Sequence, residues 1–159
     1  MEALALPREW IDVRTQCIRF RDTKSGPQLR PIGADAIGLL NALPVGAGSP
    51  WIFLAVRGKG HYVGLPKALK RLCAKARLEG VTVHVLRHSF AATAAEMGFS
   101  ELTIAGLLGH TVPGVTARYA HVPDAALVAA ADRVCSRIAA ALHGHGCNGE
   151  CQTQRDRRL

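Results

Sequence analysis

Apolar and polar residues alternate over the first fifth of the chain, which is typical of β-strands. The alternation covers residues 10–13, 17–22 and 28–32, with a Lys-Ser-Gly turn between the last two stretches. Side chains along a strand point to opposite faces in turn, so this alternation indicates strands with one buried face. We therefore predict a small three-stranded antiparallel sheet, with Lys24 at the tip of its second hairpin.

After residue 33 the apolar positions recur at helical spacing. The expected helices span residues 34–43, 63–79, 84–97, 102–108, 115–119 and 123–142. The helix at 63–79 is amphipathic, and the last helix carries an apolar stripe that runs from Leu127 to Leu142. Residues 51–56 form an apolar run that we expect to be extended. The pattern as a whole predicts a mainly helical α+β domain with the small sheet at one edge.

The chain carries a large excess of basic residues. Its 159 residues include 20 Lys and Arg against 12 Asp and Glu, a formal net charge of +8. This excess favours association with polyanions, of which double-stranded DNA is one, although many basic proteins bind no DNA. The aromatic content of 5% argues against a platform that stacks single-stranded bases. There is no membrane-length apolar run and no signal peptide, so we expect a cytoplasmic, nucleoid-associated protein without a membrane partner.

Five cysteines are scattered without the spacing of a disulfide framework. Three of them, Cys17, Cys73 and Cys135, fall on apolar faces and are predicted to be small core residues with free thiols. The other two belong to a tail, residues 143–159, that is rich in His, Gly and Arg. Its His and Cys residues could bind zinc, but their intervals match no standard zinc pattern, so a disordered tail is favoured.

Four residues in the second half of the chain have the chemistry needed to attack a DNA phosphate. His84 and Arg87 lie three residues apart at the start of an expected helix, so both can point at one target. His110 follows a short apolar helix, and Tyr119 lies on the next segment. A guanidinium can hold two phosphate oxygens, an imidazole can donate a hydrogen bond or accept a proton, and a phenol can act as the nucleophile.

In this order and at these intervals, the residues resemble the catalytic domain of the tyrosine recombinases, which include phage integrases and chromosome-dimer resolvases. The matching segments read HVLRHSF at 84–90, LLGHT at 107–111 and TARYAHV at 116–122. The resemblance covers most of the chain, from about Glu2 to Leu142. It implies DNA cleavage and rejoining through a 3′-phosphotyrosine intermediate, with no cofactor and no metal. It also implies that Lys24 is the general acid for the leaving 5′-oxygen.

The first residues resemble the end of the family's first arginine box, in which an arginine lies three residues before an acidic residue. Glu2 matches that acid, so the arginine and the DNA-clamping domain that normally precedes it are expected to be missing. We therefore expect residues 1–142 to be a truncated catalytic domain with impaired activity. One further departure is Val85, which stands where the family commonly has Asp.

Each of these assignments has a purely structural alternative. Tyr119 could be a half-buried amphipathic residue, His110 could cap a helix, and Arg87 could pair with Glu96 or Glu101. His88 is expected to orient the catalytic groups without contacting the phosphate. The basic residues that flank the second hairpin are candidates for contacts with the DNA backbone, although solvated strand charges would look the same; they are Arg19, Arg21 and Arg30.

Two other functions remain open at this stage. The chain could be a non-catalytic DNA-binding or assembly module, whose last helix docks on another recombinase protomer. It could also be a relative of the type IB topoisomerases, which use similar tyrosine chemistry. The Leu-Gly-His segment and the short Arg-Tyr spacing favour the recombinase over the topoisomerase.

Overall fold

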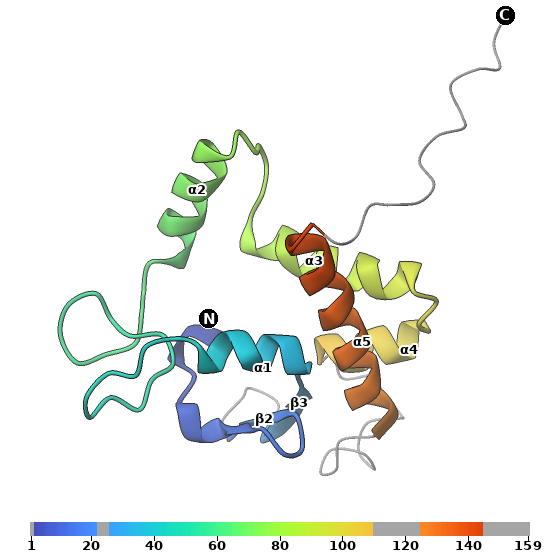
Figure 1. The fold of residues 1–159 in the computed structure, drawn as a ribbon, viewed down its shortest axis with the longest axis horizontal. Helices are drawn as coiled ribbons and strands as arrows, with labels where there is room; N and C mark the ends of the chain where they lie inside the picture. Colours follow the sequence, from blue (N-terminus) through green and yellow to red (C-terminus); the bar gives the residue numbers. More distant parts are fainter. Residues whose placement is uncertain (1, 22–25, 110–124, 145–159) are drawn as a thin grey trace, which may run out of the picture.

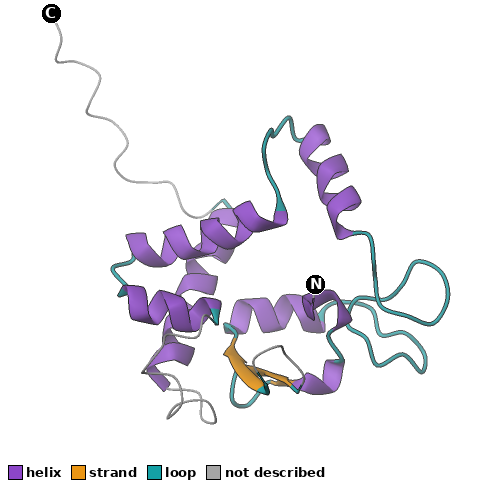
Figure 2. Ribbon diagram, turned by 180° about the vertical axis from the view of Figure 1, so that it is seen from behind, coloured by secondary structure: helices purple, strands orange, loops and turns teal. Residues whose placement is uncertain are grey.

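The computed structural model describes residues 2–21, 26–109 and 125–144. Within these ranges a small sheet and helix α1 form one part of the molecule, and helices α3, α4 and α5 form a second part beside it (Figure 1). Helix α2 stands apart from both (Figures 1 and 2). The predicted fold class, a mainly helical α+β domain with a small antiparallel sheet, is confirmed.

The sheet contains three antiparallel strands in the order β1-β2-β3. They are β1 (Ile11–Asp12), β2 (Cys17–Phe20) and β3 (Gln28–Pro31), and two 3-10 helices precede them at Glu2–Ala5 and Arg8–Trp10. Ile18 is paired with Arg30 across β2 and β3, and Arg19 with Leu29. Because paired residues point to the same face of a sheet and neighbours along a strand to opposite faces, Arg19 and Arg30 lie on opposite faces.

Within the described ranges five α-helices follow, and their positions agree with the predicted periodicity; the helix predicted at 115–119 lies outside these ranges. The five helices are α1 (Ala34–Asn41), α2 (Leu65–Lys75), α3 (Val83–Glu96), α4 (Glu101–Leu108) and α5 (Ala125–Leu142). Helix α2 ends four residues earlier than predicted because Arg77 adopts a left-handed conformation, with φ of 54°. The predicted extended run at 51–56 forms only two isolated bridges, in which Trp51 pairs with Pro7 and Leu54 with His61.

Helix α5 packs against α1, α3 and α4 and supplies much of the core (Figure 1). Its residues Ala130, Ala131 and Val134 are almost completely buried, so this part of the apolar stripe is used inside the chain. Gly33 lies directly against Cys135, and a Cβ at this glycine would overlap the cysteine side chain. The buried surface of α5 therefore fixes the start of α1 and, through the preceding strand β3, the position of the sheet.

The predicted core cysteines agree with this packing. Cys17 and Cys73 are buried, Cys135 is half-buried, and all three are free thiols. Burial raises the pKa of the Cys17 and Cys135 thiols above the ordinary value, because a thiolate is poorly solvated there.

Helix α2 buries little of its apolar face. Leu65 and Leu69 are half-buried, but Leu72 is 63% exposed although it belongs to the same apolar face. None of the described helices is long and apolar enough to cross a membrane.

Candidate active site

The N-terminal turn of α3 carries the first group of predicted site residues. Thr82 begins the helix, because its hydroxyl accepts a hydrogen bond from the backbone N–H of Val85 at 3.3 Å. This cap places His84 and Arg87 in the first turns of the helix, where both side chains are exposed. The two groups are therefore accessible to a large ligand that approaches the start of α3.

His84 and His88 are in direct contact. They lie one turn apart on α3, and their Nε2 atoms are 2.8 Å apart, with the ring planes nearly perpendicular at 84°. At this distance one ring donates a hydrogen bond through its N–H and the other accepts it, so the tautomer of one ring depends on that of the other. This is the contact that the predicted orienting role of His88 requires, and that role remains a prediction.

The C-terminal end of α4 lies opposite this group. Ser100 precedes the first residue of α4, and its hydroxyl accepts a hydrogen bond from the backbone N–H of Thr103 at 3.2 Å. The helix ends at Leu108, and the next residue, Gly109, has a φ of 65°, in the left-handed region that favours glycine. The carbonyl oxygen of Leu108, at this end of the helix, accepts hydrogen bonds from α3 and from the sheet.

Two arginines from different elements donate to that carbonyl oxygen. The Nη2 atom of Arg87 lies 2.7 Å from the Leu108 oxygen, and the Nη1 atom of Arg30, on β3, also lies 2.7 Å from it. Arg30 donates a further hydrogen bond to the side-chain oxygen of Gln28. The structure thus brings His84, His88 and Arg87 together and adds Arg30, which the sequence suggested only as a contact to the flanking DNA backbone.

The sequence did contain a signal for this position of Arg30. Gln28 and Arg30 lie two residues apart in a strand and therefore share one face, and Arg30 is paired with half-buried Ile18 on that face. A charged residue at an inward-facing strand position needs a polar partner. The partner is a backbone carbonyl of α4, 78 residues away in sequence, which no local pattern could identify.

Three of the predicted catalytic residues lie outside the described residues. They are Lys24, His110 and Tyr119. Glu2 lies in the first 3-10 helix, where only its backbone is described. Their proposed roles therefore rest on sequence alone.

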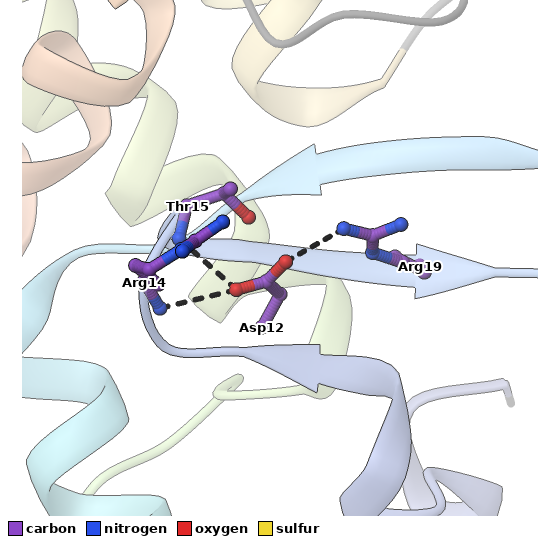
Figure 3. Close-up of polar contacts among 4 residues, drawn as sticks. All are labelled: Asp12, Arg14, Thr15 and Arg19. Carbon is purple, nitrogen blue, oxygen red and sulfur yellow. Dashed lines mark hydrogen bonds and ion pairs between the residues drawn. The ribbon is translucent and has the colours of Figure 1, made fainter.

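The other two candidates for backbone contacts are paired with acids of their own chain. Arg19 forms an ion pair with Asp12 at 2.6 Å, and Arg21 lies 3.8 Å from Glu9 (Figure 3 shows the first pair). The Asp12 carboxylate also accepts from the backbone N–H groups of Arg14 and Thr15. The Arg19 hydrogen bond, followed by those from Thr15, lowers the pKa of Asp12 from 3.8 to about 2.

A second basic region surrounds α2. From residue 36 to residue 78 the chain has no Asp or Glu, and seven exposed basic residues lie between 57 and 77. They are Arg57, Lys59, Lys67, Lys70, Arg71, Lys75 and Arg77. Within the described ranges, none of these seven forms an ion pair. Lys67, Lys70 and Arg71 border an open hollow of about 570 Å³ along the helix.

Comparison with known proteins decides the family. The model of the phage integrase family matches residues 1–126, which is most of the chain. The chain belongs to the phage integrase family. This membership places it in a family of enzymes and agrees with the resemblance carried by the His84, Arg87, His110 and Tyr119 segments.

The curated relatives of this chain are named tyrosine recombinases. Tyrosine recombinase XerD of Brucella suis is 38% identical over 88 residues, covering 53% of this chain and 28% of the relative. XerD of Rhizobium meliloti is 30% identical over 133 residues, or 76% of this chain and 42% of the relative. XerD of Mycobacterium tuberculosis is 31% identical over 140 residues. The chain spans less than half the length of these relatives. No solved structure gives a significant match.

Proposed function

We propose that this chain carries the catalytic chemistry of a site-specific DNA recombinase, with Tyr119 as the nucleophile. The observation that supports this most strongly is the convergence of His84 and Arg87 at the exposed start of α3, against the end of α4 that directly precedes His110 in the sequence. A phosphodiester needs cations and hydrogen-bond donors around its oxygens, and these side chains supply them.

In the proposed reaction the phenolic oxygen of Tyr119 attacks the phosphorus of the scissile phosphate. A phosphorus–tyrosine bond forms, the bond to the 5′-oxygen breaks, and Lys24 gives its proton to that oxygen. Arg87 stabilises the charge that gathers on the non-bridging oxygens. His84 and His110 donate to the same oxygens, and one of them accepts the phenolic proton, since a phenol with a pKa of about 10 needs a base. Rejoining reverses these steps with a new 5′-hydroxyl, so no external energy source is needed.

The basic region around α2 is proposed to bind the DNA backbone. Its seven cations are exposed and are not neutralised by acids within the described part of the chain, so they can neutralise phosphates and release counterions. Arg19 and Arg21 are less suited to this role because each already has an acidic partner. We therefore assign non-specific affinity mainly to residues 57–77.

A non-catalytic DNA-binding or assembly module is the second candidate. The separation of α2 from the other helices favours it, because DNA binding by α2 does not depend on the catalytic residues (Figure 2). For docking on another protomer, the end of α5 offers Leu142, which is 76% exposed. Most of the remaining apolar stripe is covered by the chain itself.

Trapping on nicked DNA tests the two candidates. A substrate that loses its 5′-hydroxyl fragment after cleavage accumulates the covalent protein–DNA adduct, which is measured by denaturing gel. In keeping with the expected impaired activity, we expect a weak adduct from the wild type and from Tyr62→Phe, which changes the only other tyrosine, and none from Tyr119→Phe. Binding without any adduct in the wild type would reject the catalytic proposal in favour of the module.

A further inference from the structure

Arg30 and Arg87 come from segments far apart in sequence and donate hydrogen bonds to the same atom. Each places one guanidinium nitrogen 2.7 Å from the carbonyl oxygen of Leu108. The two nitrogens are therefore separated by no more than twice that distance. Arg30 approaches from β3 and Arg87 from α3, so the pair joins the sheet to the helical part of the molecule.

Two guanidinium groups this close repel each other, and the surrounding structure offsets that repulsion. The Leu108 carbonyl lies at the C-terminal end of α4, where the helix dipole favours positive charge. The side chain of Gln28 accepts a hydrogen bond from Arg30 and so fixes its orientation. Gly109 leaves the space that Arg30 occupies, because a Cβ on this residue would overlap the Arg30 guanidinium.

Such a pair of cations is suited to an anion that has two equivalent oxygens. A guanidinium carries five N–H donors, so donating to a carbonyl is compatible with donating to a phosphate as well. A phosphodiester has two non-bridging oxygens and gathers negative charge on them during displacement, which a second cation stabilises further. His84, three residues before Arg87 on α3, is also exposed.

We propose that Arg30 is a second phosphate-binding arginine, which together with Arg87 holds the non-bridging oxygens of the scissile phosphate. The identity of this phosphate as DNA rests on the proposed function. Arg30 thereby differs from Arg19 and Arg21, which form ion pairs with acidic residues of the chain. The sequence assigned one arginine to the phosphate, and the geometry assigns two.

The rival explanation is that Arg30 only holds the end of α4 in place. The two roles are separated by comparing a normal nicked substrate with one that carries a methylphosphonate at the scissile position. The methylphosphonate has no charge to neutralise, so the loss of a phosphate-binding cation should matter much less there. A purely structural defect would slow both substrates equally.

We expect Arg30→Gln to slow adduct formation on the normal substrate about 100-fold or more. On the methylphosphonate substrate the same variant should be slowed at least tenfold less. Arg30→Lys, which retains the charge, should recover part of the normal rate. The matched control is Arg14→Gln, an exposed arginine in the turn between β1 and β2, which should react as the wild type does. Equal slowing of both substrates by Arg30→Gln, or no slowing of either, would overturn the proposal.

A binding measurement keeps this test independent of cleavage. If the wild type forms no adduct, the proposed function fails, and inorganic phosphate then serves as the probe. Arginine side-chain NMR signals of the full chain are followed during a phosphate titration, with assignments from the Arg30→Gln and Arg87→Gln variants. Signals of Arg30 and Arg87 that shift with one common dissociation constant support the pair. A shift at Arg87 without a shift at Arg30, or no shift at either, rejects it.

Discussion

The basic side chains of this chain lie in two regions that differ in whether the side chains have partners within the chain. Around the sheet and the start of α3, arginines are held by partners within the chain, since Arg19 pairs with an acid and Arg30 and Arg87 donate to one carbonyl. Around α2, seven basic residues are exposed without ion pairs in the described part of the chain.

This difference separates two uses of positive charge. A guanidinium held by its own chain has a fixed position, which suits the stabilisation of charge at one phosphate. A solvated cation on an isolated helix can meet phosphates of any sequence, which suits salt-dependent affinity. Substitutions in the first region should therefore change the rate of cleavage, and substitutions in the second should change the binding constant.

Among the changes that compare these two regions through the backbone or the exposed cations, Gly109→Ala is expected to have the largest effect. The new Cβ would overlap the Arg30 guanidinium and would also occupy a left-handed conformation, which costs about 1–2 kcal/mol for a non-glycine residue. We expect adduct formation to fall by about 100-fold or more, with DNA binding largely retained.

The control for this change is Gly98→Ala. Gly98 follows α3 with φ of 80°, and a Cβ there would meet nothing within 4 Å. It therefore has a similar backbone cost without the clash. Thermal melting should shift by a comparable amount in both variants, whereas adduct formation should fall only in Gly109→Ala. A comparable loss of activity in both would attribute the effect to backbone strain alone.

A smaller effect is expected from the triple variant Lys67→Ala, Lys70→Ala, Arg71→Ala in the region around α2. Because exposed cations act through counterion release, the salt dependence of binding should weaken by about 0.9 in log–log slope for each DNA phosphate that the variant no longer neutralises. Cleavage at saturating DNA should change little. Fluorescence anisotropy over a series of salt concentrations measures the slope. An unchanged slope would mean that this region does not bind DNA.

The smallest effect concerns the acid partner of Arg19. The pKa of Asp12 is about 2 in the folded chain against 3.8 ordinarily, so its charged form favours folding. That stabilisation is present above pH 4 and is lost as the pH falls from about 4 through 2, because the unfolded chain takes up the proton first. Asp12→Asn should flatten the fall in melting temperature over this range. Cleavage and DNA binding near neutral pH should be unaltered, since Asp12 belongs to neither function.

The strands and most helices could be predicted from the sequence because the local pattern of apolar and polar residues determines them. Alternation predicted the three strands, and helical spacing predicted α1, α3, α4 and α5. The end of α2 was predicted too late, because Arg77 would continue the amphipathic pattern but adopts a left-handed backbone. The separation of α2 could not be predicted, because periodicity identifies an apolar face without saying what covers it.

The candidate site divides in the same way. The spacing of His84, Arg87 and His88 on one helix follows from sequence, and so does the family resemblance. The position of Arg30 depends on the backbone of α4 and on a register that was not predicted residue by residue. The roles of Lys24, His110 and Tyr119 remain predictions, since these residues lie outside the described ranges.

The shared acceptor of Arg30 and Arg87 is a backbone atom, and this affects how the site would respond to mutagenesis. Any residue at position 108 supplies a carbonyl oxygen, so an alanine scan along α4 would pass over the atom that joins β3, α3 and α4. Replacing the amide between residues 108 and 109 by an ester, a weaker acceptor, would instead loosen both arginines at once. Chemical semisynthesis could therefore test a backbone contact that side-chain substitutions at position 108 leave in place.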